Sequence, residues 1–324
     1  MFSRGSVFLL GPGFIGLQIL SELVAEGYSV TTLVRRDEAR ASLEQLGSQT
    51  VKGSLDDYDQ ITSHRLLLFL TALLSAKSGK SSIYIHTSGC SAITDKSEGT
   101  FASGKIYEDD KPETIDSIAD DAPHRQIDLA ILERREQLGA KAKVSIVLPP
   151  VIYGVGKDNR LSIQIPTMAR FALKHGFAGF CGGGKAIWVQ IHVSDLAKGY
   201  MAILHEMESP SNDETSKSPY CFIENGDELS WEQMAAGIGR ALYDAGNLKD
   251  PKTKEIPMDL FGDLFQEWSI AVVGENARNR ANRLRALGWK PQAKSTFESF
   301  VEDELPILLA EKGEHGGYMA PVAS

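Results

Sequence analysis

Apolar and polar positions along the chain predict strands and helices in alternation. Residues 6–10 form a short apolar run that closes on Gly11, which is typical of a buried parallel strand. Residues 14–26 then repeat apolar side chains at helical spacing. Further strands are predicted at 28–34, from 51, at 83–87 and at 144–148, with helices at 126–138 and 297–309. This alternation favours an α/β fold with a doubly wound parallel sheet of the Rossmann type.

The segment GPGFIG at residues 11–16 lies between the first strand and the first helix. In a dinucleotide-binding turn the first glycine permits the tight turn, the second admits the pyrophosphate, and the third allows close helix–strand packing. The alternative is an ordinary glycine-rich turn, and the strand-before, helix-after context favours the nucleotide. The cofactor-binding residues predicted here are Gly11, Gly13, Phe14, Ile15 and Gly16.

Two arginines, Arg35 and Arg36, follow the second strand, where NAD-binding proteins carry an acidic residue for the ribose. An arginine pair suits a 2′-phosphate, so we expect NADP(H) to be preferred, with NAD(H) as the alternative. Two solvated surface arginines would look the same in sequence. Ser54 and Leu55 end the third strand and are predicted to contact the adenine, although Ser54 could equally cap a helix.

Composition narrows the function classes. The chain has 324 residues and a formal net charge of −9, and its basic residues form no stripe, so we expect no nucleic-acid partner. The longest apolar stretch, 66–74, is too short to span a bilayer, and residues 1–10 lack a signal-peptide pattern. The three cysteines are far apart and predict no metal site. We therefore expect a cytoplasmic protein that binds a small-molecule substrate.

Several motifs follow the glycine turn in a recognisable order. They are the arginine pair, Gly53–Asp57, Thr87-Ser88-Gly89, the segment PPVIYG at 149–154, the segment 188–195 and the segment RLRALGWKP at 283–291. Together they resemble the extended short-chain dehydrogenase/reductase family, in its NAD-dependent epimerase/dehydratase-like branch. The resemblance covers residues 7–309 and is greatest to a largely fungal subgroup with a His-Arg-x-x-Asp element, here at 124–128.

The resemblance implies a Rossmann domain and a smaller, discontinuous C-terminal substrate domain. We expect residues 1–156 and 186–206 to form the cofactor-binding domain. Residues 157–185 and 207–324 are expected to form the substrate domain. By the same resemblance, Thr87 and Pro149 are expected to contact the cofactor.

The catalytic residues of the family are not in their usual places. The family uses a Tyr-x-x-x-Lys pair one helical turn apart, in which the tyrosine exchanges a proton with the substrate. Here the matching helix begins with His124 and has Asp128 one turn on, and the position of the family's active Ser or Thr falls on Gly89. Neither alignment register supplies the tyrosine and the lysine.

Three residues are candidates for the missing chemistry. Ser88 precedes Gly89 and could polarise a substrate oxygen. His124 could act as acid and base near neutral pH, with Asp128 orienting it, although the two could also be an ordinary helix-surface pair. Tyr153 follows the sixth strand near the expected nicotinamide position, where a packed core aromatic is the alternative.

The span between Asp56 and Ile83 is shorter than the family pattern. Its 26 residues are too few for a helix, a strand, a second helix and their turns, which need roughly 40. Either residues 66–72 form a fourth strand with almost no helix after it, or residues 63–76 form a helix and the strand is absent. A truncated gene product would also have this appearance.

Two functions are consistent with these features. The first is an NADP(H)-dependent oxidoreductase or epimerase-type enzyme acting on a small carbonyl or hydroxyl compound. The second is a non-catalytic protein that senses NADP(H) and binds a protein partner, because sensor relatives keep the glycine turn and lose the catalytic pair. The sequence favours the enzyme and indicates no oligomeric state.

Overall fold

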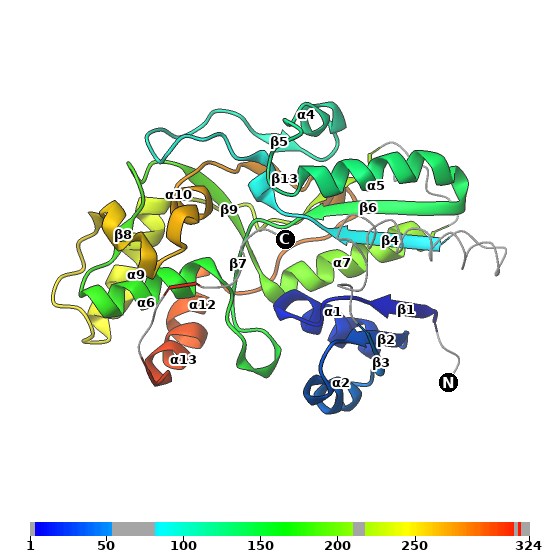
Figure 1. Ribbon diagram of the computed structural model, residues 1–324, viewed down its shortest axis with the longest axis horizontal. Helices are drawn as coiled ribbons and strands as arrows, with labels where there is room; N and C mark the ends of the chain where they lie inside the picture. The colour runs from blue at the N-terminus through cyan, green and yellow to red at the C-terminus, as the bar shows by residue number, and fades with distance from the viewer. Residues whose placement is uncertain (1–3, 54–81, 210–217, 314–316, 319–324) are drawn as a thin grey trace.

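The computed structural model describes residues 4–53, 82–209, 218–313 and 317–318. Three strands at the N-terminal end form a parallel sheet in the order β1-β2-β3 (Figure 1). These strands are β1 (Ser6–Leu9), β2 (Ser29–Val34) and β3 (Gln49–Lys52). The helices beside them are α1 (Phe14–Ala25) and α2 (Arg40–Gln45).

Helix α1 ends where the sequence predicts that it should. Gly27 adopts a φ of +85°, and its N–H donates to the carbonyl of Val24. The N–H of Tyr28 donates to the carbonyl of Leu23, which completes a Schellman motif. A residue with a Cβ would be strained at this φ, so the glycine turns the chain directly into β2.

A second parallel sheet has the order β10-β6-β4, with β6 in the middle. Its strands are β4 (Ser82–Thr87), β6 (Ala142–Leu148) and β10 (Tyr220–Phe222), and α5 (Arg125–Leu138) leads into β6. A third, mixed sheet is β11-β9-β7, made of β7 (Val151–Tyr153), β9 (Ile187–His192) and β11 (Glu228–Ser230). The predicted α/β class with parallel sheets is thus confirmed.

The remaining elements cover the third sheet and the C-terminal half. The helices are α4 (Pro112–Asp116), α6 (Gln164–His175), α9 (Trp231–Asp244), α10 (Ser269–Val273), α11 (Asn282–Ala286), α12 (Thr296–Ser299) and α13 (Leu305–Ala310). A π-helical turn, Phe300–Glu304, joins α12 to α13. Two-stranded pairs form between β5 (Tyr107–Glu108) and β13 (Asn279–Arg280), and between β8 (Gly179–Phe180) and β12 (Lys254–Glu255).

Helix α7 (Val193–Glu208) connects the two parallel sheets, and Figure 1 shows it between α1 and β4. Met201 joins the small apolar cluster formed by the N-terminal unit. Its neighbour Tyr200 belongs to the large cluster, and its hydroxyl lies 2.7 Å from the Thr87 hydroxyl at the end of β4. Adjacent side chains of α7 therefore contact both halves of the cofactor-binding fold.

One strand of the second sheet comes from the segment that the sequence assigns to the substrate domain. Within residues 186–206, which the sequence assigns to the cofactor-binding domain, α7 packs against α1 and β4. However, β10 belongs to the segment 207–324 that was assigned to the substrate domain, and it pairs in parallel with β6. The prediction missed this strand because its three residues follow a polar loop and are too few to show a period.

The shortened span between Asp56 and Ile83 falls largely at residues 54–81, outside the described residues. The presence of a fourth strand or a helix there stays a prediction. Within the residues that the structure describes, no helix is long and apolar enough to cross a membrane.

Candidate functional site

The glycine turn has the geometry that each of its glycines was predicted to provide. Gly11 adopts a φ of +73°, which favours glycine, and its carbonyl accepts a hydrogen bond from the N–H of Gly13. A Cβ atom on Gly16 would lie 2.2 Å from the carbonyl oxygen of Gly11, so only glycine allows α1 to pack this closely. A Cβ on Gly13 would meet no atom within 4 Å. The backbone at Gly13 therefore has open space beside it, and the binding of a pyrophosphate there stays a prediction.

The other predicted cofactor residues of the turn have packed side chains. The ring of Phe14 lies against Gly156, where a Cβ atom would approach it to 2.8 Å. Ile15 is half-buried and packs against the large apolar cluster. In the first turn of α1, the backbone N–H groups have no intrahelical acceptor, so these residues can offer a cofactor their amides rather than their side chains.

Arg35 and Arg36 follow β2 directly and are exposed. Because β1 and β2 are parallel, their carboxyl ends lie at the same edge, and the arginines share this edge with the glycine turn. The contact of these arginines with a 2′-phosphate stays a prediction. Ser54 and Leu55 lie outside the described residues, so their predicted contact with the adenine stays a prediction.

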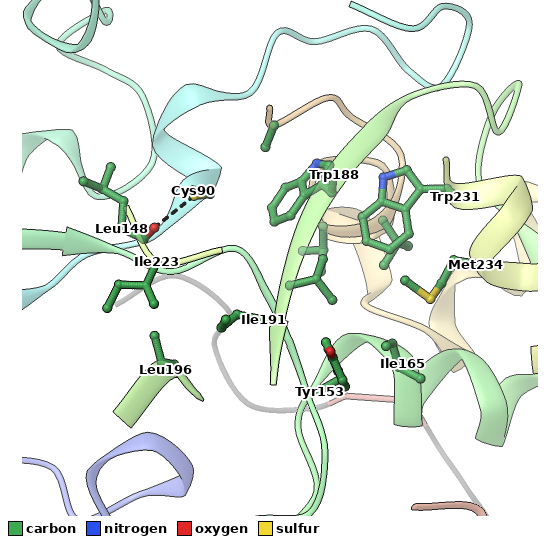
Figure 2. Packing of buried hydrophobic residues seen from close by; sticks show 14 of the residues in the cluster. Cys90, Leu148, Tyr153, Ile165, Trp188, Ile191, Leu196, Ile223, Trp231 and Met234 are labelled. Carbon is green, nitrogen blue, oxygen red and sulfur yellow. Dashed lines mark hydrogen bonds between the residues drawn. The ribbon is translucent and has the colours of Figure 1, made fainter. Parts of the chain in front are cut away.

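The end of β4 forms the second part of the candidate site. The N–H of Ser88 donates to the carbonyl of Val147, and the N–H of Cys90 donates to the carbonyl of Pro149. These bonds join the ends of β4 and β6, so Thr87 and Pro149 lie at one edge of this sheet. The Cys90 thiol also donates to the Leu148 carbonyl (Figure 2), which makes it a buried structural group.

Ser88 and Asp128 form a buried hydrogen bond across this edge. The Ser88 hydroxyl donates to Oδ2 of Asp128 over 2.9 Å. Asp128 is 1% exposed, and burial raises the pKa of its carboxyl to about 7, although the Ser88 hydrogen bond and the charge of Arg125 both lower it. Asp128 is therefore a buried carboxyl with a pKa near 7, rather than one member of a helix-surface pair.

His124 stands at the N-cap of α5 with a φ of +64°, and it turns its ring toward the end of β4. A Cβ atom on Gly89 would lie 3.0 Å from Nε2 of His124. Gly89 occupies the position where the family resemblance expects a Ser or Thr. The imidazole of His124 thus occupies the space beside the missing Gly89 side chain.

Tyr153 lies apart from these residues. It is 1% exposed and packs among apolar side chains that include Ile165 and Ile191 (Figure 2). Its hydroxyl donates to the carbonyl of Lys294 and accepts from the amide of Asn225, and burial raises its pKa. These partners hold the phenol in the core, which is the alternative that the sequence left open.

One residue of the site was missed in the sequence. Nε2 of His86 lies 3.8 Å from Oδ1 of Asp128. The signal was a histidine inside the otherwise apolar run of β4, but strand periodicity does not reveal what lies opposite a side chain. Nowhere in the described part of the chain do three His, Cys, Asp or Glu side chains gather as metal ligands.

No protein-family model matches the sequence. The protein YLL056C of Saccharomyces cerevisiae is 23% identical over 319 residues, which cover 90% of this chain and 96% of that protein. Oxidase ucsJ of an Acremonium species is 26% identical over 256 residues, 72% of this chain and 70% of that protein. A quinoline-oxide ketoreductase of Stigmatella aurantiaca is 37% identical over 71 residues, 21% of each chain.

Solved structures match nearly the whole chain. UDP-glucose 4-epimerase from Thermotoga maritima superposes with a TM-score of 0.61 at 14% identity, covering 94% of this chain and 99% of the enzyme. MoeE5, solved with UDP-glucuronic acid and NAD, gives a TM-score of 0.62 at 17% identity over 94% and 100%. The chain has the extended short-chain dehydrogenase/reductase fold. Vestitone reductase from alfalfa shares this fold, with a TM-score of 0.54 at 17% identity over 94% and 97%. The predicted resemblance is confirmed at the level of the fold.

Proposed function

We propose that the protein is an NADP(H)-dependent oxidoreductase acting on a carbonyl or hydroxyl group of a small molecule. The observation that carries the proposal is the imidazole of His124 beside Gly89, at the end of β4 where this fold places its reacting groups. The names of the oxidase and ketoreductase relatives favour redox chemistry over epimerisation. An epimerase-type reaction uses the same cofactor and is supported by the structural neighbours.

The residues of the N-terminal unit are suited to hold the cofactor. Backbone amides at the start of α1 would bind the pyrophosphate, and the open side of Gly13 admits it. Arg35 and Arg36 would bind the 2′-phosphate, which is the basis for preferring NADP(H) although the neighbours were solved with NAD. When bound, the reduced cofactor supplies the hydride for a carbonyl carbon.

The residues at the end of β4 are suited to manage the proton. His124 would donate a proton to the substrate oxygen during reduction and take it back during oxidation, because an imidazole changes charge near neutral pH. The Ser88 hydroxyl donates a hydrogen bond to Asp128 and is sheltered from solvent, so we assign Ser88 a positioning role. We assign Tyr153 no part in this chemistry because its side chain is 1% exposed and its hydroxyl is engaged by the Lys294 carbonyl and the Asn225 amide.

Two measurements test the proposal. Titration of the protein with NADPH and NADH, followed by nicotinamide fluorescence, should saturate with both and give tighter binding of NADPH. A panel of small aldehydes, ketones and nucleotide sugars with NADPH should then reveal turnover. Saturable binding without turnover on any class would favour the sensor function, and a lack of saturable binding by either nucleotide would exclude both functions.

A further inference from the structure

The side chains of Ser88 and His86 both approach the buried carboxyl of Asp128 near the end of β4. Asp128 uses Oδ2 to accept the Ser88 hydrogen bond. Its other oxygen, Oδ1, is buried and accepts no hydrogen bond from the described residues, and it faces Nε2 of His86 at 3.8 Å. The His86 side chain is 13% exposed, whereas that of Asp128 is 1% exposed. His86 therefore lies on the solvent side of the carboxyl.

The surroundings of Asp128 contain few other charged groups. Tyr84 of β4 also lies near Asp128. Burial of the Tyr84 phenol, and then the charge of Asp128, raise the phenol pKa. The Tyr84 ring stacks on His86 with centroids 6.3 Å apart. From α5, Arg125 contributes the one nearby positive charge, but its guanidinium donates to the hydroxyl of Tyr220 and the carbonyl of Asp116. No salt bridge of Asp128 with an arginine or lysine occurs within the described residues, so its negative charge is only weakly compensated.

We propose that the buried carboxyl of Asp128 and the imidazole of His86 are electrostatically coupled and act together as the positioning pair of this site. This inference deepens the proposed function and rests on it. At 3.8 Å, Oδ1 and Nε2 are too far apart for a hydrogen bond, but the charge of one group acts on the titration of the other. A carboxylate at Asp128 favours the imidazolium form of His86, and a neutral carboxyl does not.

The protonation state of Asp128 in this pair controls the hydrogen bond of the Ser88 hydroxyl and the electrostatic field at His124. A carboxylate holds the Ser88 hydroxyl by a charge-assisted bond and favours the protonated form of a nearby imidazole. A neutral carboxyl weakens both effects. The pair thus sets the acidity of His124. The family resemblance assigns the corresponding task to a lysine at the position of Asp128, whereas here the group at that position has the opposite charge. The pair itself exchanges no proton with substrate.

The inference is tested first without any turnover. The imidazole signals of the protein are titrated by NMR in the wild type, Asp128→Asn and Glu304→Gln, with the His86 signal assigned from its loss in His86→Gln. Glu304 is a matched control, because it is another buried carboxyl whose pKa is raised to about 7, and it lies at the far end of the chain. We expect the His86 midpoint to fall by about one pH unit in Asp128→Asn and to stay in place in Glu304→Gln. An unchanged His86 midpoint in Asp128→Asn would overturn the pair.

A second measurement covers the case in which Asp128→Asn does not fold. His86→Gln is then compared with the wild type in the pH profile of kcat. The limb assigned to His124 should move by about one pH unit, while KM for the substrate stays the same. An identical profile would overturn the inference, and so would a loss confined to KM. Coupled titration of Asp128 and His86 in a protein that turns over no carbonyl or hydroxyl compound would instead refute the proposed function and leave the coupled pair intact.

Discussion

The glycine-turn unit and the β4–α5 edge contribute to one site in different ways. The unit of residues 4–53 is continuous in sequence, has its own apolar cluster and keeps every glycine that a dinucleotide requires. The β4–α5 edge joins residues 40 positions apart, as in the bond from Ser88 to Asp128. At this edge Gly89 lacks the side chain that would otherwise collide with His124. The proposed cofactor contacts thus follow the pattern of the resembling family, whereas the proposed acid–base residues differ from it.

The largest effect is expected from His124→Asn, which changes only the β4–α5 edge. Asparagine tolerates the positive φ of this position, so the start of α5 should keep its shape. We expect kcat to fall by about 10²–10⁴-fold, the usual contribution of an acid–base group, with NADPH affinity unchanged. Steady-state kinetics and fluorescence titration measure the two quantities. His205→Asn, in the ion pair with Glu26, serves as the matched control. Equal activity of the two variants would remove His124 from the chemistry.

The next effect concerns the glycine-turn unit alone. Gly16→Ala places a methyl group 2.2 Å from the Gly11 carbonyl oxygen, so the turn must move. We expect the Kd for NADPH to rise by about 100-fold, or roughly 2.7 kcal/mol. Gly104→Ala is the control, because its methyl group would meet no atom within 4 Å. If Gly16→Ala binds NADPH as tightly as Gly104→Ala does, the turn is not the cofactor site.

A smaller effect separates the two nicotinamide cofactors. Replacing Arg35 and Arg36 by alanine removes the charges assigned to the 2′-phosphate, and each charged hydrogen bond contributes about 1.5–3 kcal/mol. The Kd for NADPH should therefore rise at least about tenfold, while that for NADH stays constant. Arg4→Ala removes a charge from the other end of the same unit and should change neither value. Equal losses for both nucleotides would refute the assignment of the 2′-phosphate.

The last effect leaves cofactor binding and turnover unchanged and concerns only stability. Glu304 has a pKa raised to about 7 by burial, and its Oε1 accepts from the N–H of Gly154. The pKa is higher in the folded state, so this stabilisation is complete below the ordinary glutamate pKa and is lost as the pH rises through 7. As the pH rises from about 5 to about 7, the loss of this stabilisation lowers the free energy of unfolding by about 1.4 kcal/mol per pH unit. Urea unfolding of Glu304→Gln should show a flatter pH dependence. Parallel curves would mean that Glu304 is already ionised in the fold.

The elements that the sequence predicted well have local causes. The end of α1 depends on Gly27 and the two residues beside it, so a pattern of a few residues determines it. The same holds for the glycine turn, where the close contact between Gly11 and Gly16 joins residues only five positions apart. β10 was missed because pairing with β6, rather than its own three residues, makes it a strand. Predictions were thus accurate where the deciding contacts lie close along the chain.

The sequence by itself determined the α/β class, the glycine turn and the arginine pair, because helix and strand periods and glycine conformations are properties of short segments. Only the tertiary structure decided which candidate side chains meet. It buried Asp128, placed His86 beside it, brought His124 against Gly89 and held Tyr153 in the core. The physical reason is that burial and charge environment depend on what lies opposite a residue. The pKa of a helix carboxyl such as Asp128 rises toward 7 only when the fold buries it against a strand.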